Sequence, residues 1–334
     1  MKKEVIESIV ALLATPKKIA IIPHRSPDGD AMGSTLALYH FLLKCNHQPI
    51  VIAPNEFPDF LAWMPGSEKV LIYENDRVTA TKILQEADMI FTLDFNALHR
   101  TGEMEKVLST LTAPFIMIDH HQKPDNYATY TYSDTQFGST CEMIYNFILM
   151  LDKKNLIDKT IATCIYTGIL TDSGSFRFPK TTGNTHRIVA DLIDLGVENT
   201  QIPSLLFDNN SQHSLRLLGR ALENLEVFPE HKTAFTSLSQ QELDEFHYVK
   251  GDTEGIVNYG LSIKGIDFAA IFIEHRDENI IKISLRSQGD FDVNQFARDH
   301  FNGGGHINAA GGKSNLSLEA TIAKFKDLIT QIKI

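Results

Sequence analysis

Short apolar runs alternate with helical patterns through the first half of the chain. Four of these runs are continuous and rich in branched apolar residues, as are the strands of a parallel sheet covered on both faces; they occupy residues 18–23, 49–53, 89–95 and 114–119. Between the first two runs, apolar residues recur at helical spacing from Met32 to Leu43, and Asp30 stands where this helix begins. Strand, crossover helix and strand together predict an α/β fold with a doubly wound, mostly parallel sheet.

A different pattern follows residues 171–186 and predicts a second, smaller α/β lobe. Residues 184–226 are largely helical in pattern, and residues 268–287 contain two β-rich runs typical of a hairpin. A glycine-rich segment and a final helical pattern complete the sequence. We therefore predict an N-terminal catalytic domain, a helical linker and a C-terminal substrate-binding domain over residues 1–200, 201–226 and 227–334.

Composition and charge narrow the functional classes. The formal net charge is −11, and the part from Val227 onward holds 11 Lys and Arg against 15 Asp and Glu, so the chain lacks the extended basic surface that long DNA requires. No apolar run approaches the ~18–20 residues of a membrane span, and Glu4 and Glu7 interrupt the N-terminal stretch that is similar to a signal peptide. With three cysteines and no CxxC spacing, we expect a cytoplasmic protein with reduced thiols.

Acids and histidines gather where the predicted strands end. His24 follows the first strand, Asp94 ends the third, and the triplet at residues 119–121 ends the fourth. In open α/β sheets, ligands bind at the carboxyl ends of the strands, near a switch in strand order. Asp172, at the end of a helical pattern, can reach the same place. Each segment alone is compatible with an ordinary turn or strand end, but three strand exits that all carry Asp or His favour a common site.

The mixture of residue types at these strand ends indicates a metal site. Carboxylates combined with one or two imidazoles suit Mn²⁺, whereas thiolate sites suit softer metals. Two divalent ions about 3.5–4 Å apart can activate a shared water and clamp the attacking and leaving oxygens of a phosphoryl group. Such a pair of ions needs several anionic or imidazole ligands, with one carboxylate between them. The strand ends and their flanking loops supply these residues.

Four sequence motifs occur in order along the first domain: HRSPDGDAMGS, TLDFNALHR, IDHH and GILTDSGSF. With these motifs the chain resembles the DHH phosphoesterases, which are named for the triplet at residues 119–121. The later segments SLRS and GGGHINAAGG resemble the first type of DHH-associated domain. The resemblance spans essentially the whole chain. Length and spacing are most similar to the bacterial bifunctional oligoribonucleases that also act as phosphatases on 3′-phosphoadenosine 5′-phosphate (pAp).

The resemblance implies a role for each polar residue of the first domain. The metal ligands that it implies are His24 and Asp28 for one ion, Asp30, His120 and Asp172 for the other, and Asp94 as the bridge between them. His121 would sit beside the two ions and meet the substrate phosphate. Asp119 would orient the histidines.

The second domain carries candidate substrate-binding residues. Glycines let the backbone approach a ligand closely, and consecutive N–H groups can form an anion-binding nest; the candidates are Gly303, Gly304 and Gly305. The resemblance places His306, which follows them, over the scissile phosphate. Arg286 can hold a phosphate through two parallel hydrogen bonds, and Ser287 would assist it.

The resemblance further implies a Mn²⁺-dependent phosphodiesterase and phosphatase with two ions, for which Mg²⁺ or Co²⁺ could substitute. A hydroxide between the ions would attack phosphorus in line. The expected substrates are oligoribonucleotides of about two to five nucleotides, which need no long basic track. They include the linear dinucleotides pApA and pGpG, and also pAp, which would yield AMP. No long duplex DNA and no membrane is expected as a partner, and the family suggests a homodimer.

Two alternative functions remain open. The first is a cyclic-dinucleotide phosphodiesterase, although nothing in the sequence resembles the membrane-spanning or sensory additions of membrane-bound members. The second, from a different class, is a nucleotide-sensing module with a vestigial site. The full set of candidate metal ligands argues against this function. A RecJ-type exonuclease is disfavoured by the short chain and its charge. A family II inorganic pyrophosphatase would carry a different C-terminal lobe without the GGGH segment.

Overall fold

The computed structural model of the chain describes residues 3–332 and divides them into two units, with the boundary between Asn209 and Asn210. Each unit contains its own six-stranded sheet. The predicted fold class, α/β with a doubly wound parallel sheet and a smaller second lobe, is confirmed.

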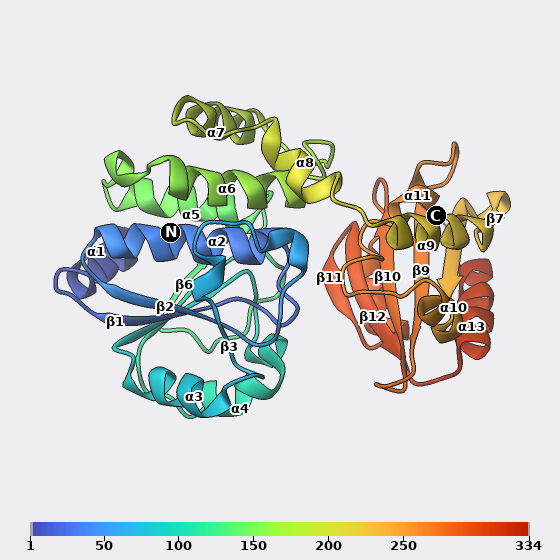
Figure 1. The fold of residues 1–334 in the computed structure, drawn as a ribbon, viewed down its shortest axis with the longest axis horizontal. Helices are drawn as coiled ribbons and strands as arrows, with labels where there is room; N and C mark the ends of the chain where they lie inside the picture. The colour runs from blue at the N-terminus through green and yellow to red at the C-terminus, as the bar shows by residue number, and fades with distance from the viewer. Residues whose placement is uncertain (1–2, 333–334) are drawn as a thin grey trace. The chain divides into compact units, whose positions relative to one another are not determined.

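The sheet of the first unit is parallel throughout and has the strand order β3-β2-β1-β4-β5-β6 (Figure 1). Its strands are β1 (Lys18–Ile22), β2 (Gln48–Ala53), β3 (Leu71–Ile72), β4 (Met89–Leu93), β5 (Phe115–Asp119) and β6 (Tyr130–Ser133). The chain moves outward from β1 to β3 and then returns to β4 on the other side of β1. The order therefore reverses between β1 and β4, where open α/β sheets place their ligands.

Helices cover both faces of this sheet (Figure 1). On one face lie α1 (Lys3–Leu12), α2 (Gly29–Lys44), α5 (Thr140–Met150) and α6 (Lys159–Asp172), and on the other α3 (Arg77–Glu86) and α4 (Glu105–Leu108). Strand β1 shows why the strand sequences are continuously apolar. Ile19 and Ile21 pack into the core on the α2 side, whereas Ala20 and Ile22 pack into the core on the α3 side. The first unit ends with α7 (Gly183–Asp194), which packs on α6, and α8 (Gln201–Phe207).

The sheet of the second unit has the order β11-β12-β10-β9-β8-β7 and is antiparallel except for the β8–β9 pair. Its strands are β7 (Glu226–Phe228), β8 (Thr233–Leu238), β9 (Phe268–His275), β10 (Ile280–Ser287), β11 (Gly304–His306) and β12 (Ala309–Ser314). Strands β9 and β10 form the hairpin predicted from the sequence.

Helices again cover both faces of the second sheet. They are α9 (Gln212–Glu223), α10 (Gln240–Glu245), α11 (Asn258–Leu261), α12 (Val293–His300) and α13 (Leu318–Gln331). Phe272 of β9 packs with α12 and α13, whereas its neighbours Ile271 and Ile273 pack with α9 and α10. Within the range predicted as a linker, α8 lies in the first unit and α9 in the second, where Leu217 and Ala221 are buried.

Short 3₁₀ helices occupy several connections: η1 (Asp59–Leu61), η2 (Ser67–Lys69), η3 (Leu98–Met104), η4 (Lys154–Leu156) and η5 (Pro229–His231). Among the helices described over residues 3–332, none combines the length and apolar character needed to cross a bilayer.

Candidate metal centre

The loop after β1 delivers three polar side chains to the switch point. His24 is buried two residues beyond the strand, and Asp28 caps α2 by accepting hydrogen bonds of 3.1 Å from the amides of Asp30 and Ala31. Asp30 follows in the first turn and is also buried. Gly29 is required by close packing, because a Cβ there would lie 2.5 Å from Oγ1 of Thr171 on α6. This acidic turn therefore directs the three side chains while it packs against α6.

Asp94 follows β4 with a left-handed backbone, φ +65°, and only 2% of its surface is exposed. Such a backbone is uncommon for a residue other than glycine, although Asp tolerates it better than most, and it tends to persist where the surroundings hold it. Here the Asp94 amide donates to the carbonyl of Ile118 at 3.1 Å, and the hydroxyl of Thr140 donates to Oδ1 at 2.9 Å. The carboxylate is thus fixed at the edge of the sheet.

The end of β5 supplies the acid and the two histidines of the triplet. Asp119 is fully buried; its Oδ1 lies 2.7 Å from Nδ1 of His121, and its Oδ2 accepts from the His121 amide at 3.0 Å. Nδ1 of His120 faces the carbonyl of Phe137 at 3.3 Å. A carbonyl oxygen can only accept, so this contact assigns the proton of His120 to Nδ1 and leaves Nε2 to face the carboxylates. His24 is held in the same way, with Nδ1 2.9 Å from the carbonyl of Arg25.

Two groups of potential metal ligands meet at Asp94. In the first, Nε2 of His24 lies 3.8 Å from Oδ2 of Asp28 and 3.6 Å from Oδ2 of Asp94. In the second, Nε2 of His120 lies 3.4 Å from Oδ1 of Asp94. The same nitrogen lies 3.7 Å from Asp30 and 3.4 Å from Asp172. The two oxygens of Asp94 therefore face different groups, as a carboxylate between two ions would.

The electrostatics of the two ligand groups favour the binding of cations. Burial opposes the charged imidazoles of His24 and His120, but the surrounding carboxylates outweigh it and raise the pKa of each to about 10. Burial alone would raise the pKa of Asp94, but the interactions with the same two histidines outweigh burial and hold this pKa well below the usual range. Burial and the charges of neighbouring acids raise the pKa of Asp30 well above its usual range, and burial raises that of Asp172 to about 7. Metal ions would supply the positive charge that protons supply here.

The N-terminus of α5 stabilises the most deeply buried of these acids. The amide of Thr140 donates to Oδ2 of Asp30 at 2.6 Å, and the amide of Cys141 donates to Oδ1 at 2.8 Å. Two unsatisfied amides of a helix end are a natural anion site, and the helix dipole adds to it. Sequence reasoning did not include Thr140. The signal that could have found it is Ser139, the helix cap that it follows at the edge of the same sheet.

His121 and Asp119 form a separate pair beside the two groups. Burial holds the pKa of His121 well below its usual range and raises that of Asp119 to about 7. Nδ1 of His121 also lies 3.8 Å from Oδ1 of Asp94, so the pair adjoins the shared carboxylate. Asp119 contacts His121 twice, and its role in orienting the histidines stays a prediction.

The candidate residues of the second unit meet at one end of its sheet. In the strand register, Arg286 of β10 lies opposite Ala309 of β12, and Ala309 lies opposite His306 of β11. Arg286 and His306 therefore stand in one row across the three strands. Nη1 of Arg286 donates to the carbonyl of Leu285 at 3.0 Å. Ser287 donates to the carbonyl of Phe291 at 2.7 Å.

The glycines beside them serve mainly close packing. A Cβ on Gly303 would lie 1.9 Å from the carbonyl oxygen of Gly311, and Gly305 has a φ of +153°. The amide of Gly303 donates to the carbonyl of Ala297, and that of Gly305 to Oδ1 of Asn294. These two amides are engaged within the unit, so the expected anion-binding nest is not available at them. Gly304 lies in β11, opposite Gly311.

Comparison with known proteins accounts for both units. The family model described as DHH family, N-terminal domain, matches residues 18–169, and the DHHA1 domain model matches residues 236–332. An exopolyphosphatase-related protein from Bacteroides fragilis, known from its crystal structure, is 39% identical. That match has a TM-score of 0.94 and covers 99% of this chain and 96% of the other. The chain belongs to the DHH family.

Two further relatives match this DHH-family chain over most of its length. A probable bifunctional oligoribonuclease and PAP phosphatase of Streptococcus mutans is 27% identical, and the match covers 98% of this chain and 97% of that protein. A bifunctional oligoribonuclease and PAP phosphatase of Thermus thermophilus is 29% identical, with 90% and 85% covered. As a member of the family, the chain is a phosphoric ester hydrolase. Enzymes of the DHH family depend on divalent metal ions, and the acids and histidines around Asp94 are placed to bind them.

Proposed function

We propose that the protein hydrolyses short oligoribonucleotides to mononucleotides and pAp to AMP, with two Mn²⁺ ions. The observation that carries the proposal is the pair of ligand groups that share Asp94 at the switch point of the sheet. Carboxylates and imidazoles in this combination suit Mn²⁺. The relatives named as oligoribonucleases and PAP phosphatases support the substrate class.

The proposed metal ligands are His24 and Asp28 for one ion, Asp30, His120 and Asp172 for the other, and Asp94 between them. When bound, two divalent ions would supply positive charge at the phosphoryl oxygens and a nucleophile at neutral pH. The donor set fits this role, because it offers nitrogen and oxygen atoms and the described residues of the two groups include no thiolate.

The chain's own residues would position the substrate and stabilise charge. We place His121 beside the reacting phosphate, where Asp119 fixes the orientation of its ring through Nδ1. His306 of the second unit would bind or protonate near the leaving oxygen. Arg286 and Ser287 would hold a terminal phosphate or sugar, with the backbone at Gly304 close to it.

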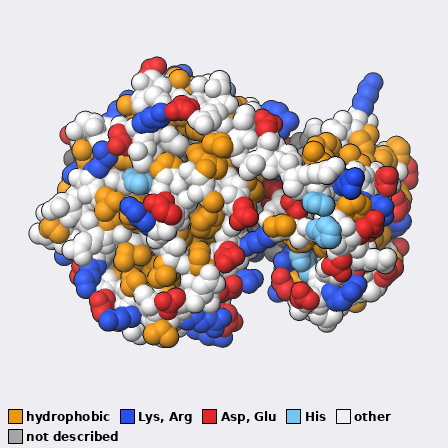
Figure 2. Space-filling model, viewed as in Figure 1, with side chains coloured by type: hydrophobic (Ala, Val, Ile, Leu, Met, Phe, Trp, Pro, Cys, Tyr) orange, Lys and Arg blue, Asp and Glu red, His pale blue; other side chains and the backbone are white. Residues whose placement is uncertain are grey.

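The charge of the protein supports a short substrate. The chain carries 42 Asp and Glu against 31 Lys and Arg, and on the face shown in Figure 2 the basic side chains are interspersed with acidic ones. A long nucleic acid needs an extended basic track, whereas two to about five nucleotides can be held by metal ions and a few placed cations.

The test is a panel assay of the purified protein with Mn²⁺. The substrates are pAp, pApA, pGpG, a cyclic dinucleotide and an RNA well beyond the expected length. We expect turnover of pAp and the linear dinucleotides, and little of the long RNA. Preferred turnover of the cyclic dinucleotide would favour the cyclic-dinucleotide phosphodiesterase instead. Bound Mn²⁺ without hydrolysis of any short substrate would contradict the proposal and favour a nucleotide-sensing module.

A further inference from the structure

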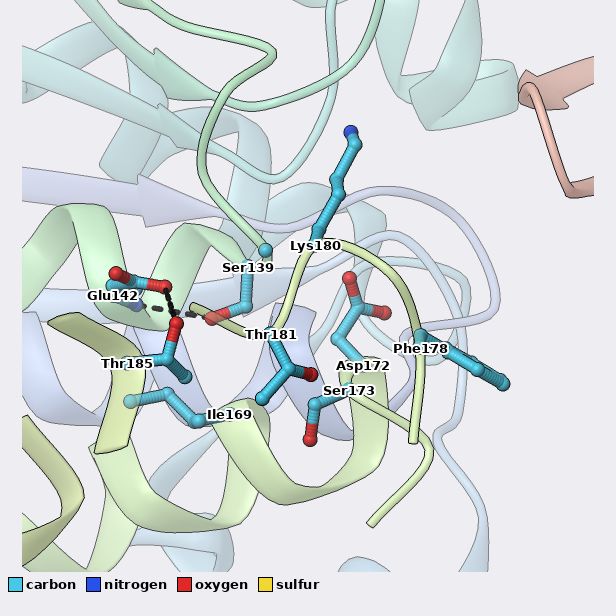
Figure 3. A pocket seen from close by; sticks show the side chains of 10 residues that line it. Ser139, Glu142, Ile169, Asp172, Ser173, Phe178, Lys180, Thr181 and Thr185 are labelled. Atoms are coloured by element: carbon cyan, nitrogen blue, oxygen red, sulfur yellow. Dashed lines mark hydrogen bonds between the residues drawn. The ribbon is translucent and has the colours of Figure 1, made fainter. Parts of the chain in front are cut away.

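A lysine that belongs to none of the family motifs lies beside the candidate metal centre. Lys180 is eight residues beyond Asp172, in the segment that joins α6 to α7, and both residues line one small pocket with Ser139 and Thr181. In Figure 3 the segment curves over the carboxylate of Asp172, and the side chain of Lys180 extends in the same direction beyond that curve. The hydroxyl of Ser173 points the opposite way.

The segment that carries Lys180 is held in a defined conformation. The carbonyl of Ser173 accepts from the amides of Arg177 and Phe178 at 2.9 and 3.0 Å, and its hydroxyl accepts from the amide of Phe176 at 3.0 Å. The three residues 174–176 all have positive φ, between 56° and 65°. Gly174 adopts this conformation without strain, but Ser175 and Phe176 carry a Cβ and are strained in it; such strain clusters at active sites and ligand clamps. On the other side of Lys180, Thr182 caps α7.

The charge of Lys180 is only partly solvated and has no direct partner. Its side chain is half-buried, and within residues 3–332 it makes no hydrogen bond or ion pair. Burial lowers its pKa, while the carboxylates of Asp172, Asp119 and Asp134 raise it by attraction at longer range. A lysine that loses part of its water without gaining a direct partner would be stabilised by an anion bound beside it.

We propose that Lys180 contacts the phosphate group that is hydrolysed. The inference rests on the proposed function and adds one residue to it. With two ions bound, metal would neutralise the charge of Asp172. The ammonium of Lys180 would then be a third cation beside the two ions, and they would repel it. An anionic group between Lys180 and the ions removes that repulsion, and the reacting phosphate is such a group. An ammonium fixed in a site with little water stabilises the charge that develops on phosphoryl oxygens.

The test compares Lys180→Gln and Lys180→Arg with the wild type, using ApA and pApA at saturating Mn²⁺. Lys159→Gln is the control, because Lys159 begins the helix that ends at Asp172, about 20 Å away along its axis. For Lys180→Gln we expect kcat/KM to fall roughly 100-fold on both dinucleotides, the loss typical of one transition-state donor. Lys180→Arg should recover most of the activity, and Lys159→Gln should match the wild type.

Mn²⁺ binding, measured by calorimetry on each variant, is the second readout. Removal of a cation near the site should leave Mn²⁺ affinity unchanged or tighter, whereas the loss in kcat/KM persists. Wild-type kinetics in Lys180→Gln would overturn the inference. So would a loss confined to pApA, or a loss explained by weaker Mn²⁺ binding. If the wild-type protein binds Mn²⁺ and cleaves neither dinucleotide, the proposed function itself fails.

Discussion

The hydroxyl of Thr140 donates a 2.9 Å hydrogen bond to Oδ1 of Asp94. That oxygen also faces Nε2 of His120 at 3.4 Å, so a residue at the start of α5 orients the carboxylate that both ligand groups share. Removal of groups that orient metal ligands typically weakens metal binding by about 10- to 100-fold. We therefore expect Thr140→Val to weaken Mn²⁺ binding by that amount in calorimetry. Thr140→Ser, which keeps the hydroxyl, should bind as the wild type does; equal binding by both variants would contradict this role.

Replacement of Asp94 should damage both metal positions together. In Asp94→Asn one oxygen becomes an amide nitrogen that cannot ligate a cation, whichever group it faces. We expect the rate of pApA hydrolysis to fall on the order of 1,000-fold. Metal analysis of the purified variant should show fewer than two ions per chain. A variant that retains two ions and wild-type turnover would show that Asp94 is not shared.

Arg286 should act on binding of a terminal phosphate. If it contributes equally in the ground and transition states, Arg286→Gln raises KM for pApA about tenfold or more and leaves kcat unchanged. The KM for ApA, which lacks that phosphate, should stay at the wild-type value. Lys282→Gln, on the same strand and paired with Glu278, is the matched control. Equal effects of Arg286→Gln on both substrates would assign Arg286 another role.

Gly168 should tolerate no side chain. A Cβ there would lie 2.2 Å from Sγ of Cys141 and 2.8 Å from Oδ1 of Asp30, so α2, α5 and α6 could not keep their spacing. Gly168→Ala is expected to lower the unfolding free energy of the first unit by about 1–3 kcal/mol. The single tryptophan, Trp63, reports this unit in urea unfolding followed by fluorescence.

The control for that substitution is Gly219→Ala. Gly219 is exposed on α9, and a Cβ there meets nothing within 4 Å. Because alanine loses less conformational freedom in a helix, this variant should be about 0.5–1 kcal/mol more stable when unfolding is followed by circular dichroism. Equal stability changes in the two variants would show that helix propensity, and not packing, governs Gly168.

Glu242 makes the stability of the second unit depend on pH. Burial opposes its charge, but hydrogen bonds from Asn224 and Ser239 and the nearby Arg220 outweigh burial and hold its pKa below the usual range. A lowered folded-state pKa stabilises the fold above the unfolded pKa of about 4.3, and this contribution is lost as the pH falls through the folded value. Glu242→Gln should therefore cost about 1 kcal/mol at pH 7 and less with increasing acidity.

Circular dichroism at pH 7 and at about pH 3.5, below the unfolded pKa of glutamate, checks this prediction. Glu245→Gln is the matched control, because Glu245 is exposed at the end of the same short helix. A difference between Glu242→Gln and the wild type that stays constant over this pH range would contradict the electrostatic origin.

Much of the fold of the first unit could be predicted because its strands are buried on both faces. Such strands are continuously apolar, and β1, β2, β4 and β5 were each located within two residues of their ends. Strands β3 and β6 were not predicted. Leu71–Ile72 is too short for a pattern, and Tyr130–Ser133 is a half-buried edge strand with mixed polarity.

The candidate ligands could be predicted because parallel strands bring their carboxyl ends to one edge, which places His24, Asp94 and the triplet together. Their orientation could not be predicted, since it depends on contacts distant in sequence. The amides of α5 that hold Asp30 are about 110 residues away from it. Lys180 was missed for a related reason: its neighbours come from three different segments, and no local pattern distinguishes it from a surface lysine.

The positions of the candidate ligands also constrain when the centre can form during synthesis. They run from His24 to Asp172 and lie entirely in the first unit, so the emerging chain completes the set before the second unit is synthesised. Domains fold as units with the N-terminal one first. Metal capture by the proposed ligands would therefore need only the first unit, and it would not wait for the second unit, which we propose binds the substrate.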